Sequence, residues 1–450
     1  MAENLKGTVN TDIFIEGFPG NIDVDWDLNL FANSAKDYNH ELCRLACKLV
    51  VVAYDKIVDD ASAEAESGFP YTQTALRDTM RAMGMDHYEI QPKAERDEVS
   101  YFIASRDITL GNETYNLILA AFIGSYKKTW YSNFDPYGVD RVANGGKGYA
   151  GDAEKGIIHL GFADARDFMH GRIKEFIRKN ASGNPIKILL MGHSRGAATA
   201  NLLGAKVLSN GGFGDGINID ADNTYVYCFA TPNFADAKKV DVNDARFKQI
   251  YNIVSPEDFV TEVLPKACGF GKYGTIYALM GKDNTSLDTY RKEKDGMQPF
   301  YQKYKTDKVY MSYKKGNTAV QKVAKVMAGS MPTLDDFYTK KMKECFNDYT
   351  PYEYYKYTLC GYVSGNDTPE DQANVNRAMK LMLGSAFDLI GTSASYRKIS
   401  KFFVFQEGIG GATGGKLGAT YFSDSHRCET YLAYLMAMSE EQLKANTLKY

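Results

Sequence analysis

One stretch, residues 187–199 with the sequence KILLMGHSRGAAT, constrains the fold more than any other part of the chain. The apolar residues 188–191 predict a strand buried on both faces, and the small residues after Gly196 predict a helix. Between the two, Ser194 stands in a G-x-S-x-G pattern. Glycines flank a serine on a strained strand-to-helix turn because side chains there would collide with the neighbouring strand and helix. The segment therefore predicts a sharp turn that presents Ser194 at the end of a buried strand.

Strands and helices are predicted to alternate around this turn. Apolar or alternating segments predict further strands at 99–105, 115–124, 225–230 and 247–254, and apolar spacing of three to four predicts helices at 34–54, 72–83, 162–178 and 197–208. Two short alternating segments within 12–31 indicate edge strands or an arm. This order is typical of an α/β fold whose central sheet is mostly parallel and has helices on both faces.

The chain has 450 residues, of which 44% are hydrophobic, so it is long enough to bury a large core. After Pro265 the pattern changes, because residues 266–367 are rich in Tyr and Lys and contain no buried strand run. Helices are predicted at 333–349 and from 368 to 389. We therefore expect a core at 1–265, a helical, cap-like insertion at 266–415, and a return to the core at 416–450.

Charge and targeting signals exclude several classes of protein. The balance of 53 basic and 56 acidic residues argues against nucleic acid or an anionic membrane surface as the main partner. The seven cysteines predict mostly free thiols, and Cys43 and Cys47 have no matching pair that would complete a metal site. No leader-like segment and no apolar run of about 18 residues is present, so we expect no signal peptide and no transmembrane helix. These features favour the cytoplasm, and secretion stays open for a chain whose leader has been removed.

A nucleophilic serine needs a base and a group that orients the base. After a turn of this kind, the acid and then the histidine follow the serine along the chain. Of six histidines, only His426 follows both Ser194 and an acid at the end of a later strand. The strand at 247–254 is followed by SPEDFV, and carboxylates at such strand ends face the ligand crevice. Asp258 is the expected acid, with Glu257 as the alternative.

The site also needs two donors for an oxyanion. One is the backbone N–H of the residue after the nucleophile, Arg195, and the other comes from a loop after an earlier strand. The strand at 115–124 ends in Gly124, which allows a tight turn, followed by Ser125, which offers an N–H and a hydroxyl. We therefore expect Ser125 and Arg195 to form the oxyanion hole.

Together these motifs resemble the class 3 lipase family of α/β-hydrolases. The resemblance is carried by residues 122–125 (FIGS for F-R-G-[ST]), Trp130, residues 133–134, 159–162 (HLGF), 192–198 (GHSRGAA), 229–232 (FATP), 258–265 (DFVTEVLP) and 425–427 with Tyr431. The chain departs from the family pattern at Ile123, where the family has Arg, and in a loosened acid motif. The resemblance covers residues 30–265 and 420–435 and does not extend to 266–415.

The resemblance implies hydrolysis of carboxylic esters, often lipids, through an acyl-enzyme and without a cofactor or metal. It also implies a lid after the oxyanion residue and transient contact with a lipid interface. Tyr126, Trp130 and Phe134 recur at every fourth position, so a helix there would carry one aromatic stripe, either as a lid or as a surface helix packed on the core. A thioesterase or amidase with the same triad, and a non-catalytic hydrolase-like binding protein, remain alternatives.

A second glycine-rich stretch, residues 410–417 with the sequence GGATGGKL, nearly matches a phosphate-binding loop. Leu417 stands where the hydroxyl that binds Mg²⁺ belongs, and no clear apolar helix follows. We interpret this stretch as a hinge between the insertion and the histidine loop.

Overall fold

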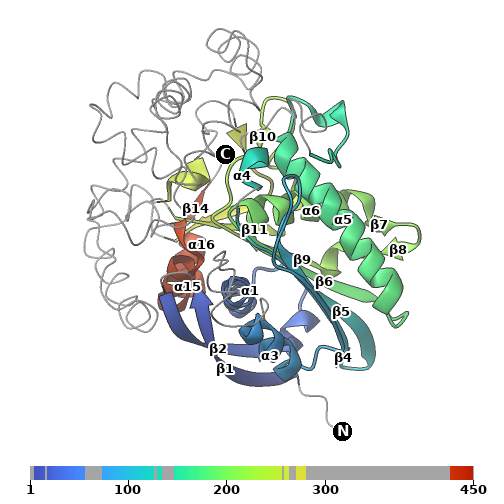
Figure 1. Ribbon diagram of the computed structural model, residues 1–450, viewed down its shortest axis with the longest axis vertical. Helices are drawn as coiled ribbons and strands as arrows, with labels where there is room; N and C mark the ends of the chain where they lie inside the picture. The colour runs from blue at the N-terminus through green and yellow to red at the C-terminus, as the bar shows by residue number, and fades with distance from the viewer. Residues whose placement is uncertain are drawn as a thin grey trace, which may run out of the picture.

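The computed structural model describes residues 5–15, 18–55, 73–125, 129–133, 146–255, 258–262, 270–279 and 426–448 (Figure 1). Its centre is an eight-stranded sheet. In spatial order the strands are β14 (Thr447–Leu448), β13 (Thr275–Ala278), β11 (Ile250–Val254), β9 (Thr224–Phe229), β6 (Ile186–His193), β5 (Glu113–Phe122), β4 (Tyr101–Leu110) and β3 (His87–Gln91). The five strands from β13 to β5 are parallel, and the outer strands are antiparallel to their neighbours. The predicted mostly parallel sheet of an α/β-hydrolase is confirmed.

Helices cover both faces of this sheet (Figure 1). On one face lie α5 (Leu160–Asn180) and α6 (Arg195–Asn210), and on the other lie α1 (His40–Ala53), α3 (Thr74–Ala82) and α15 (Cys428–Ala437). Successive side chains of a strand point to opposite faces, so in β6 Leu189 and Met191 join the α1 side and Ile188 and Leu190 join the α6 side. Burial on both sides is why residues 188–191 of this strand are all apolar.

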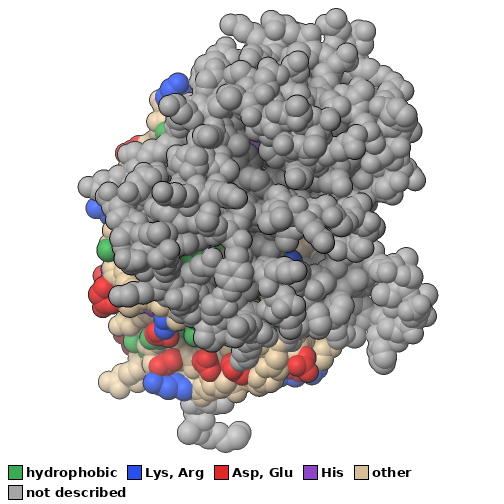
Figure 2. Space-filling view, turned by 90° about the vertical axis from the view of Figure 1, so that its left-hand side faces the viewer, with side chains coloured by type: hydrophobic (Ala, Val, Ile, Leu, Met, Phe, Trp, Pro, Cys, Tyr) green, Lys and Arg blue, Asp and Glu red, His purple; other side chains and the backbone are tan. Residues whose placement is uncertain are grey.

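The N-terminal arm is an antiparallel hairpin outside the main sheet, made of β1 (Lys6–Ile15) and β2 (Phe18–Asp27). The inward side chains Ile22, Val24 and Trp26 are buried in the core on the α1 side. The outer positions carry polar pairs, including an ion pair from Lys6 to Asp27 at 2.7 Å. Figure 2 shows acidic and basic side chains side by side along the lower edge of one face, at the level where the hairpin lies in Figure 1.

The sheet continues past residue 265, where the core was expected to end. The short β13 pairs with β11 on one side and with β14 on the other. This four-residue strand is too short to show a recognisable alternation of apolar and polar residues in the sequence. It is part of the core because it pairs with a strand on each side. The rest of the expected insertion, including the hinge at 410–417, lies outside the described residues, and its role as a cap stays a prediction.

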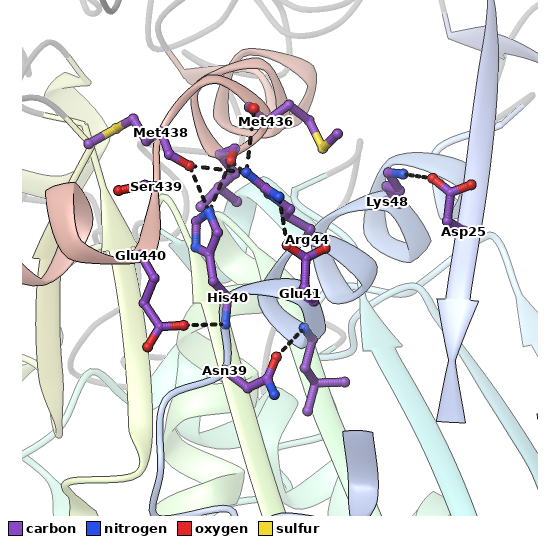
Figure 3. Close-up of polar contacts among 12 residues, drawn as sticks. Asp25, Asn39, His40, Glu41, Arg44, Lys48, Met436, Met438, Ser439 and Glu440 are labelled. Carbon is purple, nitrogen blue, oxygen red and sulfur yellow. Dashed lines mark hydrogen bonds and ion pairs between the residues drawn. The ribbon is translucent and has the colours of Figure 1, made fainter. Parts of the chain in front are cut away.

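Helix α15, which begins two residues after His426, is fixed to α1 at its C-terminal end (Figure 3). The last carbonyls of a helix have no partner within the helix. Arg44 Nε donates to Leu435 O at 2.9 Å, and His40 Nε2 contacts Met438 O at 2.9 Å. Burial, followed by the charge of Arg44, lowers the pKa of His40, so this ring is neutral and donates through Nε2. The segment that carries His426 is thereby held against the core far from the histidine itself.

Four cysteines of the described residues, Cys43, Cys47, Cys228 and Cys428, are buried free thiols. Burial raises the pKa of Cys43 to about 12, so this thiol stays protonated. No group of His, Cys, Asp and Glu within the described ranges is arranged to hold a metal ion. No helix in the same ranges is long and apolar enough to cross a membrane.

Candidate active site

Ser194 lies on the strained turn that the flanking glycines predict. It follows β6 with φ 57° and ψ −123°, and α6 begins at the next residue. A Cβ on Gly192 would lie 2.2 Å from the carbonyl oxygen of Gly196, and a Cβ on Gly196 would lie 2.1 Å from that of Phe122. Any side chain at either glycine would therefore collide with the backbone. The backbone N–H of Ser194 donates to Phe229 O at 3.0 Å, which ties the turn to the neighbouring strand β9.

The structure brings Ser194, His426 and Asp258 together in one line of hydrogen bonds. His426 Nε2 lies 2.9 Å from Ser194 Oγ, and His426 Nδ1 lies 2.9 Å from Asp258 Oδ2. A carboxylate only accepts, so Nδ1–H donates to Asp258 and Nε2 is left to accept the hydroxyl proton of Ser194. All three side chains are buried.

Asp258 is held in place by its own loop and by Tyr431. Tyr431 donates its hydroxyl to Asp258 Oδ2 at 2.7 Å and accepts the backbone N–H of Ser255 at 3.0 Å. The backbone N–H of Val260 donates to Asp258 Oδ1 at 2.9 Å. Burial, followed by the charge of Asp258, raises the pKa of Tyr431 well above its usual value, so this hydroxyl remains a donor. The alternative acid, Glu257, lies outside the described residues.

The end of β5 lies against the nucleophile. A Cβ on Gly124 would lie only 3.2 Å from Ser194 Cβ, and Ser125 follows as a buried residue. Asn133 Nδ2 donates to Ser125 Oγ, while Asn133 Oδ1 accepts from Arg195 Nη1 at 2.9 Å. Because Arg195 can only donate, it fixes which way the amide of Asn133 faces. Ser125 Oγ is therefore an acceptor toward Asn133, and its own hydroxyl proton is available for another oxygen.

The Arg195 side chain is buried beneath this loop. Its guanidinium also donates to Glu98 O at 3.1 Å and to Gly161 O at 3.0 Å. Burial lowers its pKa to about 10, so it is still charged at neutral pH. The sequence predicts a role in the oxyanion hole only for the backbone N–H of Arg195. The structure adds a contact of its side chain with Asn133, which in turn bonds to Ser125.

The predicted lid falls mostly outside the described residues. Tyr126 and Phe134 are not described, and Trp130 lies in α4 (Thr129–Asn133) without a described side chain. The aromatic stripe and its choice between lid and surface helix therefore stay predictions. Asn133, at the end of α4, is a site residue that was not assigned a role from the sequence, because its partners lie 8 and 62 positions away.

His159 lies behind the oxyanion loop, where its Nε2 donates to the carbonyl of Asn133 at 2.9 Å. Its Nδ1 has no hydrogen-bond partner among the described residues. A proton on that nitrogen would be buried without an acceptor, and burial lowers the pKa of His159 to about 3. The imidazole is therefore neutral in the folded protein.

This histidine predicts a loss of stability in acid. The unfolded chain takes up a proton below the ordinary histidine pKa, whereas the folded chain does not until about pH 3. The free energy of unfolding should therefore fall by about 2 kcal/mol from this group between about pH 7 and pH 5. Urea unfolding at the two pH values would show a smaller fall in His159→Gln than in the wild type. His87 is exposed, so His87→Gln should show the same fall in the free energy of unfolding as the wild type. An equal fall in all three proteins would contradict the prediction.

The fold and the site together define an α/β-hydrolase with a serine, histidine and aspartate arrangement. The profile of the family "Lipase (class 3)" matches residues 121–267, about a third of the chain. This segment contains both the end of β5 and the Ser194 turn and extends past Asp258. Over this segment the chain is similar to the class 3 lipase family.

Solved structures similar to the chain include several fungal lipases. A triacylglyceride lipase from Rhizomucor miehei is 16% identical, over 54% of this chain and 82% of its own, with a TM-score of 0.32. A mutant form of MDLA from Penicillium cyclopium is 16% identical, over 66% and 92%, with a TM-score of 0.32. A triacylglycerol lipase described as having a serine protease triad as its catalytic centre is 17% identical, over 55% and 80%, with a TM-score of 0.33. A search of curated protein sequences found no match.

Proposed function

We propose that the chain is a carboxylic ester hydrolase, a lipase or carboxylesterase that works through an acyl-enzyme on Ser194. The observation that carries the proposal is the unbroken hydrogen-bond line from Ser194 Oγ through His426 to Asp258. The match of residues 121–267 to the class 3 lipase family supports an ester, and within that class a lipid, as the substrate. Such a substrate would bring the protein into transient contact with a lipid interface.

Each proton transfer of this route is assigned to a residue of the chain. Ser194 Oγ attacks the acyl carbonyl as His426 Nε2 takes its proton, and the resulting imidazolium is stabilised by Asp258. His426 then gives this proton to the leaving alcohol, and the C–O bond of the ester breaks. In the second half, His426 takes a proton from water, whose oxygen attacks the acyl-enzyme, and returns it to Ser194 Oγ. The route leaves a free carboxylic acid and calls for no cofactor.

The oxyanion of both tetrahedral intermediates is assigned to Ser125 and the Arg195 N–H. With Ser125 Oγ already accepting from Asn133, its hydroxyl proton is free to point at the substrate oxygen. Ser125→Ala should lower kcat by roughly 10²–10³ with little change in KM, because such a donor acts mainly on the transition state. Ser125→Thr keeps the hydroxyl and should keep most of the activity. Equal losses in the two variants would remove the hydroxyl from the mechanism.

A panel of p-nitrophenyl esters from acetate to palmitate tests the proposed function. Hydrolysis that strengthens with acyl length would support a lipase, and a preference for short acyl groups would support a carboxylesterase. The alternatives are tested in the same assay by an acyl-thioester and an acyl anilide of matched length. Faster cleavage of either would reassign the leaving group to a thiol or an amine. No cleavage of any substrate would favour a hydrolase-like binding protein.

A further inference from the structure

A second line of hydrogen bonds runs behind the nucleophile and uses none of the groups assigned above to proton transfer. The backbone N–H of Gly124 contacts the hydroxyl of Tyr54 at 2.7 Å. The same hydroxyl lies 2.7 Å from Nδ1 of His193, the residue before Ser194. Nε2 of His193 lies 2.7 Å from the backbone carbonyl oxygen of His426. The line thus joins four segments of the chain. They are the end of β5 at Gly124 (the oxyanion strand), the end of α1 at Tyr54, the turn at His193 and the segment that carries His426.

The direction of every bond in this line is fixed by chemistry. A carbonyl oxygen only accepts, so His193 Nε2 carries a proton and donates it to His426 O. In a neutral imidazole Nδ1 is then an acceptor, and Tyr54 donates its hydroxyl proton to it. The Tyr54 oxygen still has room to accept, and the N–H of Gly124 fills it. Each donor in the line is thereby paired with an acceptor, provided that His193 is neutral and carries its proton on Nε2.

The surroundings of His193 favour that neutral form. The side chain is 2% exposed, and burial, followed by the charge of His426, lowers its pKa well below the usual value. The rings of His193 and His426 lie with centroids 4.8 Å apart. In the proposed reaction His426 becomes positively charged, and a neutral neighbour does not oppose that charge.

The backbone of His426 needs a contact that holds it in place, because this residue comes from a segment distant in sequence from its partners. It lies 168 positions after Asp258 and 232 positions after Ser194. Helix α15 is held on α1 at its far end, whereas His426 lies before the helix begins. A displacement of about 1 Å at a reacting group can cost roughly 100-fold in rate.

We propose that His193 and Tyr54 are positioning residues that hold the backbone of His426 and of Gly124 at fixed places on either side of Ser194. The carbonyl of His426 is held by His193, and the N–H of Gly124 is held by Tyr54. This keeps the base and the oxyanion strand aligned on the nucleophile. The inference rests on the proposed function, since it gives these contacts their purpose in ester cleavage.

Two amide replacements of His193 separate the two halves of the line. Glutamine places an N–H near the position of Nε2 and can still donate to His426 O. Asparagine places an oxygen near Nδ1 and keeps the contact with Tyr54, but it is too short to reach His426. Rates are expressed per serine that a fluorophosphonate titrates, so that misfolded protein is not counted.

We expect His193→Asn to lower kcat for p-nitrophenyl butyrate by about 10- to 100-fold with KM unchanged within about twofold, as for loss of one buried hydrogen bond in the transition state. His193→Gln should stay within about fivefold of the wild type. Tyr54→Phe should lower kcat as well, and its effect should combine with that of His193→Asn by less than the product of the two. Full activity in His193→Asn, or equal losses in the two amide variants, would overturn the proposal.

A spectroscopic readout is independent of catalysis. In protein labelled with ¹⁵N-histidine, the resonances that disappear in His193→Asn should belong to an Nε2–H tautomer. An Nδ1–H tautomer or a doubly protonated ring at neutral pH would overturn the proposal even if the enzyme is active. A wild type that cleaves no ester but shows the Nε2–H tautomer would contradict the proposed function and leave the line of contacts standing.

Discussion

Replacing Ser194 by alanine is expected to lower the rate of ester cleavage by roughly 10⁴–10⁶, because removal of one member of a triad disables the whole unit. The residual rate would come from the oxyanion donors and from substrate binding. The hydroxyl is the only group removed, and the strain of the positive φ at Ser194 arises from Cβ, which alanine keeps, so the substitution adds no strain. The fold should therefore survive. The measurement is kcat for p-nitrophenyl butyrate, with the melting temperature as a check on folding.

Ser182→Ala is the matched control for this prediction. Ser182 is exposed and bonds to Asp107 far from the nucleophile turn, so its loss should leave kcat unchanged. A Ser194→Ala protein with wild-type activity, prepared free of contaminating esterase, would place the reaction elsewhere in the molecule.

Replacing Asp258 by asparagine should lower kcat by about 10⁴, as in the best-studied triad of this kind. Asp258 Oδ2 accepts both His426 Nδ1–H and the hydroxyl of Tyr431. An amide NH₂ at that position would donate to Nδ1 instead, and Nε2 would then carry the proton and lose its ability to accept one from Ser194. The side chains are nearly the same size, so we expect a correctly folded protein with a changed histidine tautomer.

Two further variants test whether Asp258 is the acid of the triad. Glu257→Gln should change kcat little, and the reverse result would move the acid by one position. Tyr431→Phe keeps Asp258 and its bond to His426 but removes one donor to the carboxylate. It should therefore lower kcat by less than Asp258→Asn does, and a larger loss would make Tyr431 the more important group.

The central fold was predictable because its signals are local. Residues 188–191 are apolar at every position because β6 is buried on both faces, and the glycines beside Ser194 are required by backbone atoms a few ångströms away. Helix α5 has its own helical spacing of apolar residues, and the hairpin of β4 and β5 has its own turn residues. His426 was found by its order along the chain, which the connectivity of the fold imposes.

The rest depends on contacts between residues that are distant in sequence. The sheet includes β13, which lies beyond the predicted core boundary at 265, and this strand is recognisable only by its pairing with β11 and β14. The helix expected from residue 34 begins at His40, where Asn39 accepts the N–H of Leu42 as the cap. Tyr54 lies 139 positions from His193 and 70 from Gly124, so no local pattern indicates their contact.

The central claim is that Ser194 is the nucleophile, and covalent labelling tests it most directly. The wild-type protein is treated with a fluorophosphonate, digested and examined by mass spectrometry. We predict a single phosphonyl adduct on the peptide containing Ser194, formed much more slowly in Asp258→Asn because His426 can no longer accept the hydroxyl proton. An unmodified Ser194 beside a labelled serine elsewhere, or no adduct on a folded protein that cleaves esters, would contradict the claim.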